Sequence, residues 1–295
     1  MTIFTEYIST AGLDAVLDSL KLLPFLFLTY LVMELLEHRT GERASRFISR
    51  AGRLGPALGG LLGAIPQCGF SAAAAGLYAG RVVTVGTLVA VLLSTSDELA
   101  AVMLSSAATD ATVVIKLLTV LGIKVVFSML VGFAVDLVLR RERRDEIGEL
   151  CDSEGCHCHE RGVLLSSLIH TAKIFGFIFA VTLAINTVIF FVGEDRIGLL
   201  LHDLPVVGEL IAGLIGLIPN CASSVVLTEL YLGGTLTASQ LLAGLFTGGG
   251  VGLLVLFRVN RDLRENLLIL LTVYLSGTLL GILLGSTGVC ALLGL

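Results

Sequence analysis

The sequence predicts an all-α polytopic membrane protein built from two inverted-topology repeats, with about ten helical segments in total. Three observations carry this prediction. Hydrophobic residues make up 55% of the 295 residues and charged residues only 15%, with a mean hydropathy of +0.96, which is typical of polytopic membrane proteins. A proline-containing motif interrupts an apolar run twice, as Ile-Pro-Gln-Cys at 65–68 and Ile-Pro-Asn-Cys at 218–221. Arginines gather at alternate ends of the apolar segments.

The two motifs belong to a longer internal duplication. At the constant offset that pairs Cys68 with Cys221, identical residues recur through the flanking sequence. The identical pairs include Gly55 and Gly208, Gly60 and Gly213, Gly63 and Gly216, Ser71 and Ser224, Tyr78 and Tyr231, Gly80 and Gly233, and Gly132 and Gly285. We therefore divide the chain into a first inverted repeat at 1–140, a linker at 141–162 and a second inverted repeat at 163–295.

In each repeat we expect three spanning helices and one re-entrant broken-helix hairpin. In the first repeat, Leu13–Leu36 is long enough to cross at about 20 residues per bilayer, and the arginines that follow place its end in the cytoplasm. Leu54–Ile65 and Phe70–Gly80 are each too short to cross, so we expect a hairpin that enters and leaves on the cytoplasmic side. The remaining spans are Val82–Ala108, interrupted at 94–98, and Val113–Leu139.

The second repeat gives the same elements with the opposite orientation. Its expected segments are an outward span at Val163–Val192, a hairpin from the outer side at Leu210–Gly233, an inward span at Leu236–Phe257 and a last span at Leu267–Leu284. With this topology the Lys and Arg residues outside the spans face the cytoplasm, except Arg196, as the positive-inside rule requires. We expect a multi-pass protein of the bacterial inner membrane with both termini outside.

The two proline motifs predict the substrate site. Proline ends a helix and leaves backbone carbonyls without helical partners, which is tolerable at membrane depth only inside protein or beside a watery cavity. Paired interruptions in two halves are the best sequence indicator of a transporter's binding site. Close helix packing through small residues is the alternative. The substrate-binding residues expected here are Gln67, Cys68, Ser71, Asn220, Cys221 and Ser224.

The interruption at 94–98 adds charge to this site. Asp97 and Glu98 would each cost at least a few kcal/mol inside a span unless they faced a cavity or a partner. The repeat mate at 247–251 reads Thr-Gly-Gly-Gly-Val and is uncharged, so we expect an asymmetric site. A purely structural ion pair with Lys116 or Lys124 is the alternative, and both roles combine if a lysine releases the carboxylate when a cation or proton arrives. The expected site residues here are Ser94, Thr95, Ser96, Asp97, Glu98 and Thr247.

Two further features bear on metal binding. Glu229, in the second hairpin, is either a second cation ligand or proton carrier, or a solvated residue near the outer mouth. The linker contains a dense set of soft and borderline ligands, which we expect to form an accessory metal-capture or sensing loop. A linker that binds metal only weakly is the alternative. The ligands of the loop are Cys151, Cys156, His157, Cys158 and His159.

The ligand types favour a divalent transition metal over a metalloid. Carboxylate, amide and carbonyl oxygens suit Mn(II), whereas thiols suit softer ions. Zn(II), Fe(II) and As(III) remain alternatives, because two facing thiols can bind trivalent arsenic. The expected metal ligands are Asp97, Glu98, Cys68, Cys221, Asn220 and Gln67, with Lys124 and Lys116 as coupling or counter-charges.

The paired Pro-Gln-Cys-Gly and Pro-Asn-Cys motifs, Ser-Thr-Ser-Asp-Glu at 94–98 and Cys-His-Cys-His at 156–159 resemble a known family. The chain is similar to the bacterial ten-helix heavy-metal exporters, whose members are named arsenic efflux proteins or manganese transporters. The resemblance covers essentially the whole chain, and the two proline motifs are its most specific part. It implies export of a metal or metalloid across the inner membrane.

Three function classes follow from these features. The first is a secondary exporter coupled to protons or sodium, because the chain has no Gly-x-x-x-x-Gly-Lys motif for nucleotide binding. The second is a transporter of a small anion or organic solute attracted by helix N-termini and Lys124. An intramembrane enzyme is disfavoured, because no histidine lies in either motif to activate Cys68 or Cys221. We expect no required cofactor and no nucleic-acid partner, and a homo-oligomer is an open alternative.

Overall fold

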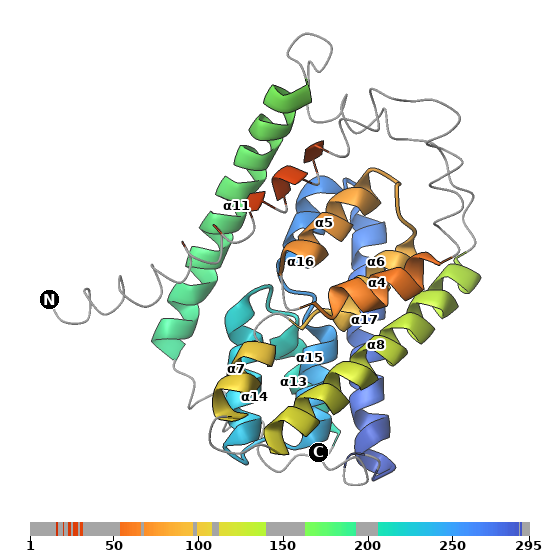
Figure 1. The fold of residues 1–295 in the computed structure, drawn as a ribbon, viewed down its shortest axis with the longest axis vertical. Coiled ribbons are helices and arrows are strands. Elements are labelled where there is room, and N and C mark those ends of the chain that lie inside the picture. Colours follow the sequence, from red (N-terminus) through yellow and green to blue (C-terminus); the bar gives the residue numbers. More distant parts are fainter. Residues whose placement is uncertain are drawn as a thin grey trace, which may run out of the picture.

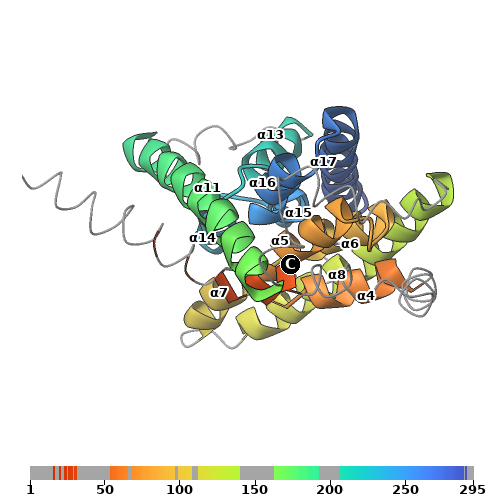
Figure 2. The same ribbon diagram turned by 90° about the horizontal axis from the view of Figure 1, so that it is seen from above.

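The computed structural model describes residues 16, 20, 23, 24, 26–28, 30, 31, 54–65, 68–96, 99–107, 112–139, 163–192, 206–288 and 290. Helices make up the regular structure of this part of the chain, which confirms the predicted all-α class. Figures 1 and 2 show a bundle of mostly short helices, with the long helix α11 (Val163–Val192) along one edge.

The first hairpin consists of α4 (Gly55–Gly63) and α5 (Cys68–Ala79), close to the two short segments that the sequence predicts. Pro56 stands in the first turn of α4, where its missing N–H costs nothing because that donor has no helical acceptor. At about 1.5 Å per residue neither helix reaches across a hydrocarbon core of about 30 Å. The hairpin therefore does not provide a single continuous span.

The predicted interrupted span is two helices, α6 (Val85–Ser94) and α7 (Leu99–Ala107). Thr84 caps the start of α6, because its Oγ1 accepts a hydrogen bond from the Thr87 backbone N–H at 3.1 Å. At the other end Thr95 Oγ1 donates to the Val91 carbonyl at 2.7 Å. The long helix α8 (Thr112–Val138) then follows without a break.

The second half repeats this order of elements. After α11 come α13 (Val207–Gly216), α14 (Cys221–Leu232), α15 (Ala238–Thr247), α16 (Val251–Val259) and α17 (Leu263–Ser286). At the offset of the sequence duplication, α14 has the same bounds as α5, and α15 has the same bounds as α6. The duplicated sequence thus gives helices that begin and end at matching residues.

Local capping explains the helix starts in the second half. Thr237 and Gln240 form a capping box on α15, in which each residue's side chain accepts a hydrogen bond from the other's backbone N–H. Asp262 caps α17 by accepting from the backbone N–H groups of Arg264 at 3.0 Å and Glu265 at 3.2 Å. These caps satisfy donors that otherwise have no helical acceptor.

Five helical stretches of the described chain are long and apolar enough to cross a membrane. They are Val85–Ser105, Thr112–Val138, Ser167–Ile185, Ala238–Val259 and Leu263–Ser286. Each coincides with one of the six predicted crossings, and the sixth, Leu13–Leu36, lies mostly outside the described residues. The polytopic membrane class is therefore confirmed.

The two halves interlock through their short helices. α5 packs against α16, and α14 packs against α7, so each hairpin contacts the broken helix of the other half (Figure 1). The contact between α5 and α16 depends on Gly252, because a Cβ there would lie 2.7 Å from Ser71 Cβ and 2.8 Å from the Ser71 carbonyl oxygen. A small residue at such a crossing lets two helix backbones approach closely.

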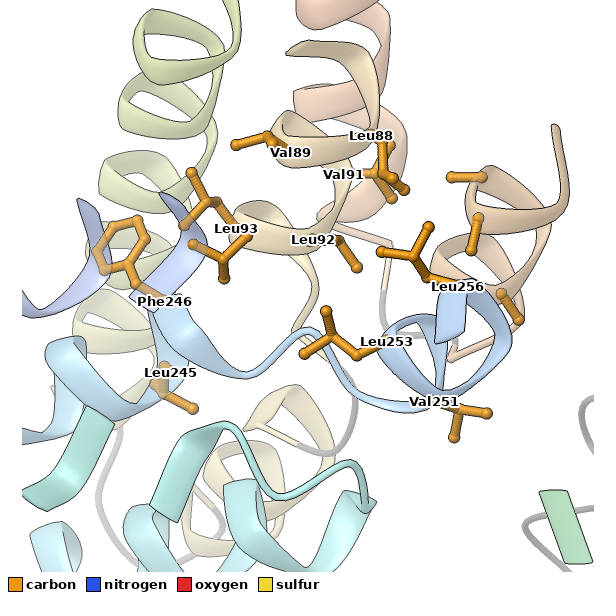
Figure 3. Packing of buried hydrophobic residues seen from close by; sticks show 14 of the residues in the cluster. Leu88, Val89, Val91, Leu92, Leu93, Leu245, Phe246, Val251, Leu253 and Leu256 are labelled. Carbon is orange, nitrogen blue, oxygen red and sulfur yellow. The ribbon is translucent and has the colours of Figure 1, made fainter. Parts of the chain in front are cut away.

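The buried core lies where the two broken helices meet. Figure 3 shows Leu92 and Leu93 of α6 beside Phe246 of α15 and Leu253 of α16. Leu92, Leu93 and Phe246 are each 0% exposed. The interrupted helices thus form the centre of the protein, whereas α8 and α17 carry many exposed leucines that would face lipid.

An ion pair ties the end of the first hairpin to the second half. Arg81 lies in the turn after α5, and its guanidinium contacts both carboxylate oxygens of Glu265 on α17, at 3.1 and 3.0 Å. Burial disfavours the charged guanidinium, but the hydrogen bonds and the charge of Glu265 outweigh this and raise the pKa of Arg81. Asn260 Nδ2 donates to the same carboxylate at 3.2 Å. The cross-half contact is therefore bidentate and further hydrogen-bonded.

Some predictions fall on residues that the structure does not describe. These are the arginine-rich segment after the first span, the linker at 141–162 with its Cys/His loop, and most of the last residues of the chain. The division into repeats at 1–140 and 163–295 stays a prediction, as do the re-entrant paths and the positions of both termini.

Candidate functional site

The two helix breaks mark the candidate site. α6 ends at Ser94 and α7 begins at Leu99, while α15 ends at Thr247 and α16 begins at Val251. The second break contains Gly250 with a φ of 53° and a ψ of −148°, a conformation that only glycine adopts readily. Each break leaves carbonyl groups at the end of a short helix without helical partners.

Lys124 joins the two breaks. It extends from α8 and is 0% exposed, and its Nζ donates to the carbonyl oxygens of Thr95 at 2.5 Å and Leu245 at 2.6 Å. The ammonium also lies 5.8 Å from the centroid of the Phe246 ring, within reach of a cation–π interaction. One side chain therefore contacts the C-terminal ends of α6 and α15, which belong to different halves.

Electrostatics explain why a cation is stable at this point. The C-terminal end of a helix carries a partial negative charge from its aligned peptide dipoles. Thr95 is the C-cap of α6, and Leu245 lies in the last turn of α15. Two such ends point at one ammonium, which offsets part of the large desolvation cost of a buried charge.

A small cavity of about 10 Å³ adjoins the breaks. This volume is roughly what one water molecule needs. Hydroxyl groups, backbone atoms and small residues form its walls. The described lining residues are Thr95, Ser96, Gly216, Ser223, Ser224, Gly244, Leu245 and Gly248. Both residues whose carbonyls hold Lys124 therefore also line the cavity.

The second proline motif lies at the cavity wall formed by α14. Asn220 is 3% exposed and caps α14, because its side-chain oxygen accepts from the Ala222 backbone N–H at 3.5 Å. Ser223 Oγ donates to the Asn220 carbonyl at 2.8 Å. The N-terminal end of α14, with its positive dipole end, thus adjoins the same cavity as the two helix C-termini, because Ser223 and Ser224 line it.

Glycines let the first helix of each hairpin approach the adjacent break. A Cβ on Gly216 would lie 2.0 Å from the Gly244 carbonyl oxygen and 2.3 Å from Thr247 Oγ1. A Cβ on Gly63, the equivalent position in the first half, would lie 2.1 Å from Ser94 Oγ. The same close approach thus occurs twice, once against each broken helix.

The structure brings some predicted site residues to the cavity and places others elsewhere. Thr95, Ser96 and Ser224 line it. Ser94 and Thr247 are buried, but their hydroxyls donate to backbone carbonyls of α6, and of α13 and α15. These two placements are structural, and their substrate-binding role stays a prediction.

Three further candidates lie away from the described lining. Ser71 is 0% exposed and packs against α16 at Gly252. Glu229 is exposed on α14. Lys116 is half-buried on α8, with its Nζ 5.6 Å from the centroid of the Tyr231 ring.

The predicted metal ligands lie largely outside the described part of the chain. Gln67, Asp97, Glu98 and the Cys/His loop are not described, and for Cys68 and Cys221 only the helical backbone is. Among the described residues, no group of three or more His, Cys, Asp or Glu side chains is placed to hold a metal ion. Asp97 does, however, directly follow Ser96 of the cavity wall in the sequence.

Sequence reasoning expected free backbone carbonyls at the proline motifs but did not single out those of Thr95 and Leu245. The Leu245 carbonyl and the small residues Gly216, Gly244 and Gly248 carry no side-chain chemistry that a pattern would reveal. Glu209, which the sequence analysis did not single out, is 7% exposed in α13 and accepts a hydrogen bond from Ser239 at 2.8 Å. Among these positions only Gly216 carried a sequence signal, because glycine recurs at its matching position, Gly63.

Comparisons with known proteins identify the family. Residues 10–195 match the family described as “Putative, 10TM heavy-metal exporter”. No curated protein and no solved structure matches the chain. The match covers the first half, the linker and α11.

Proposed function

The chain belongs to this family of 10TM heavy-metal exporters, and we propose that it is a secondary-active exporter of a divalent transition metal, with Mn(II) favoured. The cavity between the two helix breaks is the observation that carries the proposal. Its described walls offer hydroxyl and carbonyl oxygens from Thr95, Ser96 and Ser223. The acidic pair Asp97 and Glu98 follows directly in the sequence.

The donor chemistry supports a hard cation. Mn(II) prefers carboxylate, carbonyl, hydroxyl and water oxygens, and the cavity walls supply such groups. Gln67, Asn220, Cys68 and Cys221 from the proline motifs complete the proposed ligand set, and the two thiols extend it to Zn(II), Fe(II) or As(III). The Cys/His loop of the linker would act as an accessory metal-capture segment.

The proposed mechanism is alternating access between two inverted repeats in the inner membrane. Helices α8 and α17, which occupy matching places in the two halves, run in opposite directions in Figure 1, which supports an inverted arrangement. The cavity lies between elements of both halves, so movement of one half against the other would expose it to alternate sides. In this proposal both termini lie outside, and a proton or sodium gradient drives export.

A second candidate function is transport of a small anion or organic solute. The buried charge of Lys124 contacts two residues of the cavity wall, and the N-terminal end of α14 adjoins the cavity, so both would attract negative charge. The two candidates differ in the group they need. Anion transport should be lost in Lys124→Met and retained in Asp97→Asn, whereas metal transport should be lost in Asp97→Asn.

The test is metal flux in proteoliposomes with Mn²⁺, Zn²⁺, Cd²⁺ and arsenite. We expect Mn²⁺ flux to fall at least about tenfold in Asp97→Ala, because a carboxylate ligand is lost, and to persist in Cys68→Ser. Lys173→Met on the exposed face of α11 is the matched control and should transport as the wild type does. Arsenite or Cd²⁺ flux that depends on Cys68 would instead make the thiols the site. If no metal is transported, transport of a small anion or organic solute becomes the better-supported function.

A further inference from the structure

Glu209 is a buried acid that the proposed mechanism does not use. It lies in the first turn of α13 and is 7% exposed. Its Oε1 accepts a hydrogen bond from Ser239 Oγ at 2.8 Å, but within the described part of the chain its Oε2 is buried and has no hydrogen-bond partner. A buried polar atom without a partner is rare and calls for an explanation, such as a bound ion or a functional role.

A chain of hydroxyl groups leads from the protein surface to this carboxylate. Thr237 is exposed at the start of α15, and its Oγ1 lies 2.9 Å from Ser239 Oγ. Because Ser239 gives its only hydroxyl hydrogen to Glu209, Thr237 is the donor to Ser239. Both hydrogens of the chain therefore point from the surface toward Glu209, which is the arrangement that passes a proton inward.

The first half also has a carboxylate at the start of its broken helix, but that carboxylate is fully partnered. Asp136 of α8 accepts from Thr84 Oγ1 at 2.7 Å with one oxygen and from the Gly86 backbone N–H at 2.8 Å with the other. At the offset of the duplication, Gly86 is matched by Ser239. Asp136 thus has the contacts of a residue that caps a helix, whereas Glu209 has one oxygen without such a donor.

We propose that Glu209 is the proton carrier of the transport cycle, which takes up one proton through Thr237 and Ser239 after the metal has left and releases it when the next metal ion binds. During uptake each hydroxyl gives up one proton and receives one. The net change is one proton moved from water at the surface to the Glu209 carboxylate. This inference rests on the proposed metal export and names the proton as its coupling ion.

The chemistry of this position suits a proton better than a metal ion. Among the described residues, no group of three or more His, Cys, Asp or Glu side chains is placed to hold a metal ion, and Glu209 is a single carboxylate beside hydroxyls. Acidic residues within membrane-spanning bundles form the proton relays of pumps and transporters. A proton removes the charge, and a neutral carboxyl costs less to bury than a carboxylate.

Among the described residues, few other titratable groups face Glu209 from the helices that pack against α13. α13 itself and α15 have no other ionisable side chain. α17 approaches with its last turn, where a Cβ on Gly285 would lie 3.6 Å from Oε1, and its charged first turn, with Arg264 and Glu265, is about 30 Å farther along the helix. The remaining groups on or next to α14 and α17 are Cys221, Glu229, Tyr231, Tyr274 and Cys290.

Helix α13 connects this acid to the substrate cavity. Gly216, at the other end of α13, lines the cavity and lies about 10 Å from Glu209 along the helix. Between them, the Gly213 carbonyl accepts from Thr247 Oγ1 at 2.7 Å. A change of charge at Glu209 alters how the start of α13 packs on α15, and a short rigid helix passes that change to the cavity wall.

The decisive experiment compares Mn²⁺ flux and proton movement in proteoliposomes of the purified full chain, wild type against Glu209→Gln. The amide still accepts from Ser239 but cannot carry a proton, so Mn²⁺ transport driven by a pH gradient should fall at least about tenfold, together with the accompanying proton movement. Exchange of Mn²⁺ for Mn²⁺ at equal pH needs no net proton transfer and should persist. Glu209→Asp, which restores a carboxyl, should recover part of the coupling.

Two further variants and one measurement without metal complete the test. Asp136→Asn is the matched control, because it changes the fully partnered acid and should leave the coupling unchanged. Ser239→Ala interrupts the hydroxyl chain and should slow proton movement while Mn²⁺ exchange persists, and it serves if Glu209→Gln does not fold. In infrared difference spectra between acidic and neutral pH, the band of protonated carboxyl groups should be smaller by one group in Glu209→Gln.

Each outcome decides between the alternatives. A folded Glu209→Gln variant with wild-type proton coupling would overturn the inference and leave metal export intact. A folded variant that also loses Mn²⁺ exchange would count against it, because Glu209 would then build the transport path and not carry the proton. If the wild type transports no Mn²⁺, Zn²⁺ or Cd²⁺, the proposed function and the coupling role fail together, and the infrared band alone then decides whether Glu209 binds a proton.

Discussion

The two halves share one backbone plan but carry different side chains at matching places. α5 and α14 have the same bounds in the duplication, as do α6 and α15. Yet Lys124 in the first half is matched by Gly277, and Arg81 by Gly234. At these two positions the first half carries a charge and the second half has a glycine. The comparison teaches that the duplicated backbone creates matching helix ends, while side chains that differ between the halves decide what those ends bind.

The charge at the hairpin turn shows the same difference. Arg81 has a φ of 57° and Gly234 a φ of 77°, so both turns use the left-handed conformation. That conformation costs a non-glycine residue about 1–2 kcal/mol. In the first half the bidentate contact with Glu265 offsets this cost, and in the second half glycine avoids it.

The largest expected effect compares the two close approaches at Gly216 and Gly63. Gly216→Ala should lower the free energy of unfolding by about 3 kcal/mol, because its Cβ meets the backbone of α15 at 2.0 Å and backbone cannot turn away. Gly63→Ala should cost less, about 2 kcal/mol, since its nearest atom is the rotatable Ser94 Oγ and its nearest backbone atom, the Val91 carbonyl oxygen, lies farther away at 2.7 Å. Thermal unfolding in detergent measures both.

The matched control for these glycines is Gly176→Ala on α11, where a Cβ would meet nothing within 4 Å. This variant should be as stable as the wild type or slightly more stable, because alanine favours the helix. Equal losses of stability in Gly63→Ala and Gly216→Ala would contradict the expectation that the closer backbone contact at Gly216 costs more.

A middle-sized effect is expected at the ion pair between Arg81 and Glu265. A double-mutant cycle with Arg81→Ala and Glu265→Ala should give a coupling energy of about 1–2 kcal/mol. Solvent screening lowers this coupling energy, because the Arg81 side chain is 29% exposed, although that of Glu265 is only 8% exposed. Chemical denaturation of the four variants in detergent measures it.

Replacing Arg81 with glycine tests separately how much the left-handed conformation of this turn costs. Arg81→Gly should be more stable than Arg81→Ala by about 1 kcal/mol, since glycine adopts the left-handed φ without a Cβ penalty. Gly234→Ala should in turn destabilise the second half by a similar amount. If Arg81→Ala proved the more stable variant, the left-handed conformation would not carry the cost assigned to it.

The smallest expected effect concerns the caps of the two broken helices. Thr84 Oγ1 caps α6 and also donates to Asp136 at 2.7 Å, whereas Thr237 Oγ1 caps α15 beside Ser239. Thr237→Ala should cost about 0.5 kcal/mol and Thr84→Ala about 1 kcal/mol, because only the latter leaves a carboxylate without its hydroxyl donor. Thr84→Ser and Thr237→Ser keep the hydroxyl and should restore most of the loss. A larger loss at Thr237 would reverse the ranking.

Much of the fold could be predicted because it depends on local features. Helices end where proline interrupts an apolar run, and likewise at the polar residues 94–98 and at the glycines 248–250. The long apolar runs then give helices such as α8 and α17, which follow the predicted spans to within a few residues. The class, the breaks and the matching order of elements needed no knowledge of contacts.

Less of the candidate site could be predicted, because its donors lie on the backbone of segments distant in sequence. Lys124 was expected to be a counter-charge, but nothing in the sequence placed it on the carbonyls of Thr95 and Leu245. Every residue has a carbonyl, so a pattern of residue types cannot show which one is aimed at a cation. The burial of Glu209 beside Ser239 likewise follows from how α13 packs on α15.

By itself the sequence determined the membrane class, the duplication, the positions of the helix breaks and the resemblance to metal exporters. Hydropathy, proline and glycine act locally, so these features can be read along the chain. Only the tertiary structure decided that α5 pairs with α16, that α14 pairs with α7, and that one lysine links the ends of α6 and α15. These contacts depend on close approaches between distant segments, where the absence of a single Cβ determines which backbones can meet.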